Sequence, residues 1–434
     1  MTSRKWPATS ASPIFSTDPF RVASRRQIGR VVAFTSIVGI LLLTMRSNPA
    51  LRDFVASTPL TCVICGEEGA LDFILNILFF SPLGAGLFLA GVAPGFAVAA
   101  GGALSLLVET IQYFVLVGRD ASLGDLLANT LGTALGVAVA RAVWSTHAPP
   151  VPTVARRWLA GALALGYAGL ALGGWSLEPS ASSSGHWHAR TAYPAPDAIP
   201  FRGTIDQFLV GSVEVRPGPV DDPATLRAAL LEPVRTVTIR GRGALLTDPQ
   251  SWLAGLDADG HVEVSVGQEW CAFTYSGRRR AFDLRLHEAD IFVETTCRDS
   301  LDTPFEVRAT QSTSAVTISA QDPHGSWQAS APLYLATGWV SFWPYADHLV
   351  PRQGAAEVAW IALLLLPAGL WMSPAGAGTR TWAAVALASV GALYLFTAAF
   401  GMAAVLPLHL VGIPLGLGAG WLMRFAWGRV QSRT

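Results

Sequence analysis

The chain has 434 residues, of which 51% are hydrophobic and only 14% are charged, and its formal net charge is zero. A mean hydropathy of +0.41 is too high for an ordinary soluble protein and is typical of a protein with several membrane spans. The balanced charge gives no basic surface for nucleic acid. Composition therefore excludes a soluble enzyme of the usual kind and argues against a nucleic-acid partner.

Apolar segments of about 17–25 residues predict a membrane α-helical bundle of eight spans, because this length crosses a bilayer core. The last two segments form one run around Gly401 that is too long for a single helix, so we expect a hairpin there, with His409 inside it. The predicted spans are 28–45, 71–91, 95–117, 122–144, 158–177, 355–372, 382–400 and 403–423.

Orientation follows from the Arg and Lys residues in the short loops and tails. A cytoplasmic N-terminus places thirteen of them inside and three (Arg46, Arg52 and Arg119) outside. The first span lacks a small-residue cleavage site, so we expect a retained helix rather than a secretory signal. The thirteen are Arg4, Lys5, Arg21, Arg25, Arg26, Arg30, Arg141, Arg156, Arg157, Arg380, Arg424, Arg429 and Arg433.

The sequence between the fifth and sixth spans is polar and rich in turns, and its short runs alternate polar and apolar residues. Their spacing predicts an inserted all-β sandwich, which the topology places outside the cytoplasm. The runs begin at Thr236, His261, Phe282, Asp290, Phe305 and Ala315. The predicted divisions are a cytoplasmic tail (1–27), five helices (28–177), the β domain (178–354) and three helices with a cytoplasmic tail (355–434).

Four cysteines occur in parts of the chain that we place in an oxidising compartment. Cys271 and Cys297 lie on neighbouring strand candidates, and we expect a disulfide between them. Cys62 and Cys65 form a C-x-x-C without the partners of a zinc or thioredoxin site, so we expect a local disulfide or inert thiols.

Polar side chains lie at fixed offsets in the second, third and fourth spans, where a charge costs several kcal/mol unless it has a partner or water. Helical spacing places them on facing surfaces in the outer half of the bilayer, and they predict a small polar pocket open to the outside. The alternative is that they fix helix packing by hydrogen bonds, as we favour for Asn76 and Asn129. The candidate ligand-binding residues are Asp72, Asn76, Glu109, Gln112, Arg119, Ser122, Asp125 and Asn129.

The same positions resemble a known family. The pattern D-x-x-x-N-x-x-x-F-x-P-L-G from Asp72, E-x-x-Q from Glu109, and R-x-x-S-x-x-D-x-x-x-N-x-x-G-x-x-x-G from Arg119 is similar to that of the VanZ family of bacterial membrane proteins. The resemblance covers about residues 61–144. Founding members are associated with reduced susceptibility to teicoplanin-type glycopeptide antibiotics, so the resemblance implies a cell-envelope role and no particular reaction.

The β domain resembles the concanavalin-like and laminin-G-like sandwiches that occur joined to VanZ-like helices, whose sheet face often binds glycans. The likeness rests on the strand pattern and on the ending LYLATGWVSFWP from Leu333. Trp339, Phe342 and Trp343 fit either stacking on sugars or anchoring at the membrane interface, and we favour anchoring.

Two further patterns admit a plain and a functional interpretation. His186 and His188 form an H-x-H that we expect to belong to a flexible stalk rather than to a metal site. Arg278, Arg279 and Arg280 are expected at a solvated hairpin tip, with binding of anionic lipid headgroups or polymers as the alternative.

Two functions follow. The first is a binding protein of the cell membrane, which holds a lipid-linked cell-wall precursor in the outer pocket and a glycan on the β domain, among membrane lipids. The second is an enzyme acting on a lipid-phosphate or glycan, with Glu109 or Asp125 as general base and Arg119 countering charge. We favour the first, because the sequence shows no nucleophile together with its base or a metal set. Ser122 is the one hydroxyl well placed as a nucleophile, and beside Asp125 it fits a helix N-cap equally well. No metal or cofactor is expected.

Overall fold

The computed structural model describes two compact units of the chain, one formed by Met1–Val151 with Arg424–Thr434 and the other by Pro152–Met423. Each is treated by itself below. The described residues are 19–45, 59–64, 66–116, 121–145, 152–183, 185–192, 201–243, 251–269, 272–294, 304–344, 348–349, 354–372 and 378–433.

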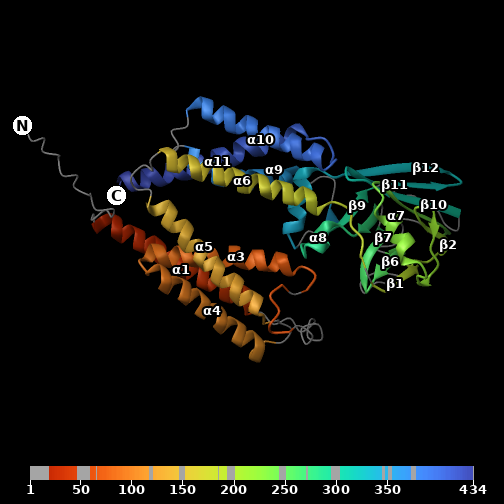
Figure 1. Ribbon diagram of the computed structural model, residues 1–434, viewed down its shortest axis with the longest axis horizontal. Helices are drawn as coiled ribbons and strands as arrows, with labels where there is room; N and C mark the ends of the chain where they lie inside the picture. The colour runs from red at the N-terminus through yellow and green to blue at the C-terminus, as the bar shows by residue number, and fades with distance from the viewer. Residues whose placement is uncertain are drawn as a thin grey trace, which may run out of the picture. The chain divides into compact units, whose positions relative to one another are not determined.

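Within the described residues, eight helices are long and apolar enough to cross a membrane, which confirms the predicted helical membrane region (Figure 1). A polar β domain interrupts them after the fifth. The long helices are α1 (Pro19–Thr44), α3 (Gly69–Ala90), α4 (Pro94–Val115), α5 (Leu123–Ser145), α6 (Pro152–Ser176), α9 (Gly354–Met372), α10 (Thr379–Ala399) and α11 (Pro407–Arg433).

Helices α3 and α5 of the first unit approach each other closely because glycines line their contact. A Cβ atom built on Gly132 would lie 2.3 Å from the carbonyl oxygen of Ile77, and one on Gly136 would lie 1.8 Å from that of Ser81. On the α3 side, a Cβ at Gly84 would meet the carbonyl oxygen of Thr133 at 1.9 Å. The G-x-x-x-G step therefore brings the two backbones into contact.

The β domain of the second unit is a sandwich of two sheets, which confirms the predicted all-β insertion (Figure 1). One sheet has the order β13-β9-β8-β7-β6-β1-β4 and the other the order β12-β11-β10-β5-β2-β3. The strands are β1 (Trp187–Thr191), β2 (Thr204–Val210), β3 (Val213–Glu214), β4 (Gly218–Pro219), β5 (Arg235–Arg242), β6 (Ser251–Ala258), β7 (His261–Glu269), β8 (Ala272–Gly277), β9 (Asp290–Glu294), β10 (Pro304–Gln311), β11 (Ala315–Asp322), β12 (Gly325–Pro332) and β13 (His348–Leu349).

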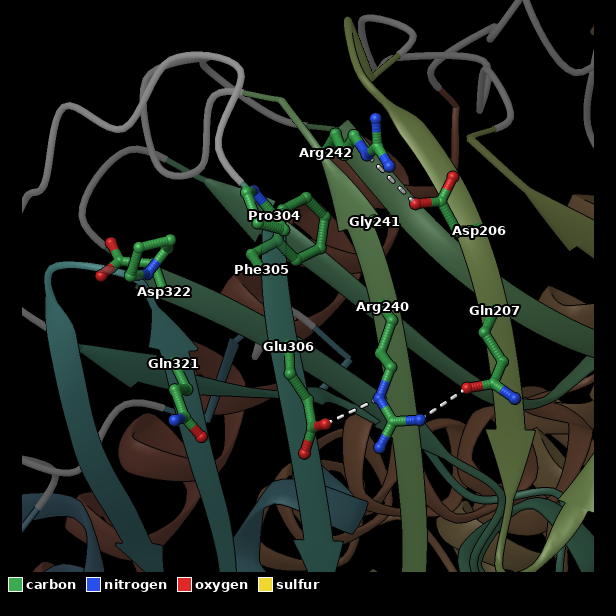
Figure 2. Close-up of a pocket in the computed structure, with 11 residues that line it drawn as sticks. Asp206, Gln207, Arg240, Gly241, Arg242, Pro304, Phe305, Glu306, Gln321 and Asp322 are labelled. Carbon is green, nitrogen blue, oxygen red and sulfur yellow. Dashed lines mark hydrogen bonds and ion pairs between the residues drawn. The ribbon is translucent and has the colours of Figure 1, made fainter.

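Alternation along the strands decides which side chains form the core of the sandwich. In β10, Phe305 and Val307 are buried, while Glu306 between them points to the other face (Figure 2), because successive strand residues point to opposite faces. The antiparallel register with β11 then sets Val307 beside Ala320 in the buried layer. A helix, α7 (Pro223–Leu230), packs beside β2, β3 and β5 and buries Leu226 and Leu230.

Three predictions for the β domain are wrong. The run from Phe282 is not a strand, because it lies in a short helix, α8 (Arg280–Asp283), and its following turn. The Phe282 ring packs against the guanidinium of Arg278 at 4.4 Å from Arg278 Cζ to the ring centroid, and Asp283 forms an ion pair with Arg278 at 2.8 Å. These contacts outweigh the apolar–polar alternation of the run.

The basic turn is not a solvated hairpin tip either. Arg279 is only 1% exposed and donates from Nη2 to the carbonyl oxygen of Ala289 at 2.7 Å, and Arg278 is mostly buried. The H-x-H pattern lies at the start of β1 rather than in a stalk. His188 pairs across the sheet with Asp257, and the backbone N–H of His186 donates to Asp259.

The 3-10 helix η2 (Leu335–Phe342) joins the β domain to the membrane helices of its unit by packing on α6 and α9. Gly338 and Gly173 let the η2 and α6 backbones touch, since a Cβ on Gly338 would lie 2.5 Å from Gly173 Cα. The Phe342 ring stacks on Trp360 of α9 with 5.2 Å between centroids. Phe342 is therefore held against a helix, while Trp343 remains half-exposed.

Candidate functional site

The first turn of α5 gathers several of the polar residues that the sequence singled out. The Ser122 hydroxyl accepts the backbone N–H of Asp125 at 3.0 Å and donates to Asp125 Oδ2 at 2.9 Å, which is the geometry of an N-cap. The amide of Asn76, one turn into α3 from Asp72, donates to Asp125 Oδ1. The Asp125 carboxylate is thus fixed from two helices.

The Glu109 carboxylate lies behind this turn and takes part in capping α5. It is 9% exposed, and its Oε2 accepts the backbone N–H of Ser122 at 3.1 Å. The carbonyl oxygens of Leu60 and Cys62 accept the next two N–H groups of α5, at 2.9 and 3.2 Å. Protein groups therefore satisfy the amides that a helix N-terminus would otherwise offer to an anion.

A small pocket opens beside the capped turn, at the N-terminal ends of α3 and α5. Its volume is about 90 Å³, enough for a few water molecules or one small polar group. The Asp72 side chain is exposed at this pocket, and Glu109 is not among its lining residues. The lining residues are Val63, Gly69, Asp72, Phe73, Ser122, Gly124 and Asp125.

Two other predicted site residues point to different partners. Gln112 is buried and donates from Nε2 to the carbonyl oxygen of Thr44, the last residue of α1, at 3.2 Å. Asn129 is buried and donates to Ser105 of α4 at 3.0 Å. Neither lines the pocket, and each makes a hydrogen bond between two helices.

Three sequence predictions fall wholly or partly outside the described residues. Arg119, the predicted cation of the site, lies outside the described residues. Cys271 and Cys297, with their predicted disulfide, lie outside them as well. Cys62 is disulfide-bonded, while Cys65 lies outside the described residues.

Comparison with known proteins identifies the helices that carry this site. Residues 10–144 match the family model VanZ/LLP1. This part of the chain is VanZ-like. No curated protein and no solved structure matched the chain. Residues 10–144 are called the VanZ-like segment below, and the concanavalin-like character of the β domain remains a prediction.

The second unit contains a buried polar cluster that the sequence did not predict. His409 Nε2 lies 2.9 Å from Glu357 Oε2, and the Thr337 hydroxyl donates to Glu357 Oε1 at 2.8 Å. The backbone N–H of Leu406 donates to His409 Nδ1 at 3.3 Å, so Nδ1 is the acceptor and Nε2 carries the proton. The cluster ties η2, α9 and α11 together, and all three side chains are buried.

Buried charges also lie inside the β domain, around the turn that was expected in solvent. Burial raises the pKa of Glu288 to about 7, although nearby Arg279 opposes the rise. Glu288 Oε1 accepts the backbone N–H of Arg279 at 2.6 Å. Burial likewise raises the pKa of Glu263, which pairs with Arg278 at 3.0 Å.

These shifts predict a pH dependence of stability. Because the Glu288 pKa is raised from 4.5 in the folded state, its stabilising contribution is complete below pH 4.5 and is lost as pH rises through about 7. A pKa rise of this size corresponds to roughly 3 kcal/mol in the free energy of unfolding. We expect the thermal unfolding midpoint of the β domain to fall between about pH 5 and pH 8.

The matched variant is Glu288→Gln, which keeps the acceptor for Arg279 and removes the ionisation. We expect its unfolding midpoint to depend less on pH and to exceed that of the wild type at pH 8. Calorimetry of the purified full chain measures both quantities, and an equally steep pH dependence in the variant would contradict the assignment.

Proposed function

We propose that the VanZ-like segment is a binding module of the bacterial cell envelope and that the pocket beside α5 holds a small polar group of a cell-wall or lipid-linked ligand. The pocket between Asp72 and Asp125 carries this proposal. An ionised carboxylate only accepts hydrogen bonds, and the Ser122 hydroxyl is already committed to Asp125. The ligand group that fits is therefore a donor, such as an ammonium, an amide or a hydroxyl.

The two carboxylates support the proposal in different ways. Asp125 is held by Asn76 and Ser122, so its oxygens are fixed before a ligand arrives. Asp72 lies in the first turn of α3 with an exposed side chain. An acidic group at a helix N-terminus is mildly favourable, which is the plain alternative for Asp72.

The remaining parts of the proposal come from topology. The distribution of Arg and Lys favours cytoplasmic termini, with the β domain and the pocket on the outer side of the cell membrane. There the pocket would face envelope precursors and the β domain would meet envelope glycans. The resemblance to VanZ proteins supports a link to susceptibility to teicoplanin-type antibiotics.

The enzyme hypothesis has less support. Glu109 caps the α5 backbone and does not line the pocket, so it is poorly placed as a general base for a ligand held there. Asp125 lines the pocket and remains the one candidate base of the two. Two carboxylates facing the same small space also disfavour a phosphate ligand.

Mass spectrometry of the purified full chain tests the binding proposal. We expect the wild type to retain a co-purified envelope molecule that carries a donor group, and Asp72→Asn to lose it with an unchanged unfolding midpoint. Glu67→Gln, which neutralises an exposed carboxylate outside the pocket lining, is the control and should retain the molecule. Equal retention by Asp72→Asn would contradict the proposed contact.

A further inference from the structure

The N-terminal part of α1 carries arginines with different surroundings. Arg25 donates from Nη2 to the carbonyl oxygen of Phe88 at 3.1 Å, and its Cζ lies 5.0 Å from the centroid of the Phe88 ring. These contacts place Arg25 at the C-terminal end of α3, where the last carbonyl oxygens of the helix favour a cation. Arg25 therefore joins α1 to α3, whereas Arg26 and Arg30 are exposed.

Arg26 and Arg30 lie on the same side of α1, because residues four apart on a helix are neighbours. Between them, Gly29 holds α1 against α3, since a Cβ there would lie 2.2 Å from the backbone nitrogen of Ala90. Arg26 also lies beside the end of α3, with its Nε 3.3 Å from the position of a Cβ on Gly91. Backbone contact between the two helices thus fixes the positions from which both arginines project.

No carboxylate among the described residues neutralises Arg26 or Arg30, since neither forms an ion pair or a side-chain hydrogen bond with them. The described carboxylates of the first unit lie in the opposite halves of its helices. They are Glu67, Glu68, Asp72, Glu109 and Asp125. Two neighbouring guanidinium groups without a carboxylate form a site that attracts an anion, and their planar donors match a phosphate group.

The same side of α1 continues as exposed apolar surface. Phe34 and Val38 follow Arg30 at intervals of four residues, and both are exposed. The helix is long and apolar enough to cross a membrane. This face of α1 is therefore basic near its N-terminal end and apolar beyond it, which matches the charged headgroup and the acyl chain of a phospholipid.

We propose that an anionic phospholipid binds along this face of α1, in the leaflet at the N-terminal end of the helix. Its phosphate lies between Arg26 and Arg30, and an acyl chain lies along Phe34 and Val38. A zwitterionic lipid fits less well, because its headgroup cation is repelled by the two guanidinium groups. The proposal depends neither on the pocket beside α5 nor on which side of the membrane the N-terminus lies.

Native mass spectrometry of the detergent-purified full chain tests the proposal, with phosphatidylglycerol and phosphatidylcholine of the same acyl chains as probes. We expect the wild type to bind phosphatidylglycerol more tightly than phosphatidylcholine. The double variant Arg26→Gln, Arg30→Gln should bind phosphatidylglycerol roughly tenfold more weakly, because each basic residue adds to the attraction for an anionic lipid. The control double variant Arg141→Gln, Arg216→Gln removes two exposed guanidinium groups elsewhere and should bind like the wild type.

Two further measurements separate the parts of the proposal. Phe34→Ala keeps both arginines and should also weaken phosphatidylglycerol binding, so the acyl contact can be tested without a change of charge. Glycerol 3-phosphate carries the phosphate without acyl chains, and at the same concentration as the lipid it should not displace phosphatidylglycerol. Displacement would indicate a site for free phosphate and contradict the proposed lipid.

Either of two results would overturn the proposal: equal affinity of the wild type for the two lipids, or equal affinity of the wild type and the double variant for phosphatidylglycerol. The unfolding midpoint of the double variant should match that of the wild type, since both side chains are exposed. Asp72→Asn should leave phosphatidylglycerol binding intact, which keeps this test separate from the function proposed for the pocket.

Discussion

Replacing Gly136 by alanine is expected to remove most of the folded protein from the membrane. The added Cβ would lie 1.8 Å from the carbonyl oxygen of Ser81 and 2.7 Å from its carbon. Both are backbone atoms of α3, so no side chain can rotate away, and α3 and α5 must separate. Overpacking in a well-packed core costs about 1–3 kcal/mol, and a backbone collision lies at the upper end of that range or above it.

The control for this prediction is Gly39→Ala in α1, because no atom lies within 4 Å of the Cβ position at Gly39. We expect the control to keep the wild-type level of monodisperse protein in size-exclusion chromatography of solubilised membranes, while Gly136→Ala falls several-fold. Equal levels for the two variants would show that α3 and α5 do not meet through these glycines.

Arg235→Met is expected to destabilise the β domain by roughly 3–5 kcal/mol, the cost of breaking a buried charged network by removing one partner. Arg235 is 1% exposed and donates to the side chain of Gln311 at 2.8 Å and to the carbonyl oxygens of Ser180 and Arg278 at 3.3 and 2.9 Å. The methionine fills similar volume but leaves these three acceptors without the guanidinium.

Arg240→Met on the same strand provides the control for this second prediction. Arg240 is about half exposed, and exposed ion pairs contribute about 0–1 kcal/mol, so a shift of that size or less is expected. Thermal unfolding of the purified chain followed by circular dichroism compares the variants. A similarly small shift of the unfolding midpoint in both variants would contradict the burial of the Arg235 network.

The sequence was sufficient to predict the elements whose signal is local. A bilayer span needs a long apolar segment, and each predicted span overlaps a helix such as α3 or α9. Strands with regular alternation, such as β10 and β11, were also predicted. The run from Phe282 was not, because its conformation depends on contacts with Arg278 that strand periodicity does not reveal.

In the candidate site, too, the sequence predicted what depends on local spacing and missed what depends on tertiary packing. Asp72 and Asn76 share a helix face at a spacing of four, and both lie close to Asp125 in the structure. The role of Glu109 as a cap for α5 needed the position of a second helix, so the sequence could not distinguish a cap from a base. Glu357 and His409 lie far apart in the chain and meet only through tertiary packing.

The central claim is that the pocket lined by Asp72 and Asp125 binds a cell-wall or lipid-linked ligand, and that these two residues do more than stabilise helix packing. The most direct measurement is teicoplanin susceptibility together with membrane protein level, in a deletion strain complemented with wild type, Asp72→Asn or Asp125→Asn. We predict that Asp72→Asn changes susceptibility to that of the deletion strain while the protein level stays at the wild-type value. The claim would be contradicted if both variants showed wild-type susceptibility. It would also be contradicted if susceptibility shifted toward that of the deletion strain only in proportion to a fall in protein level.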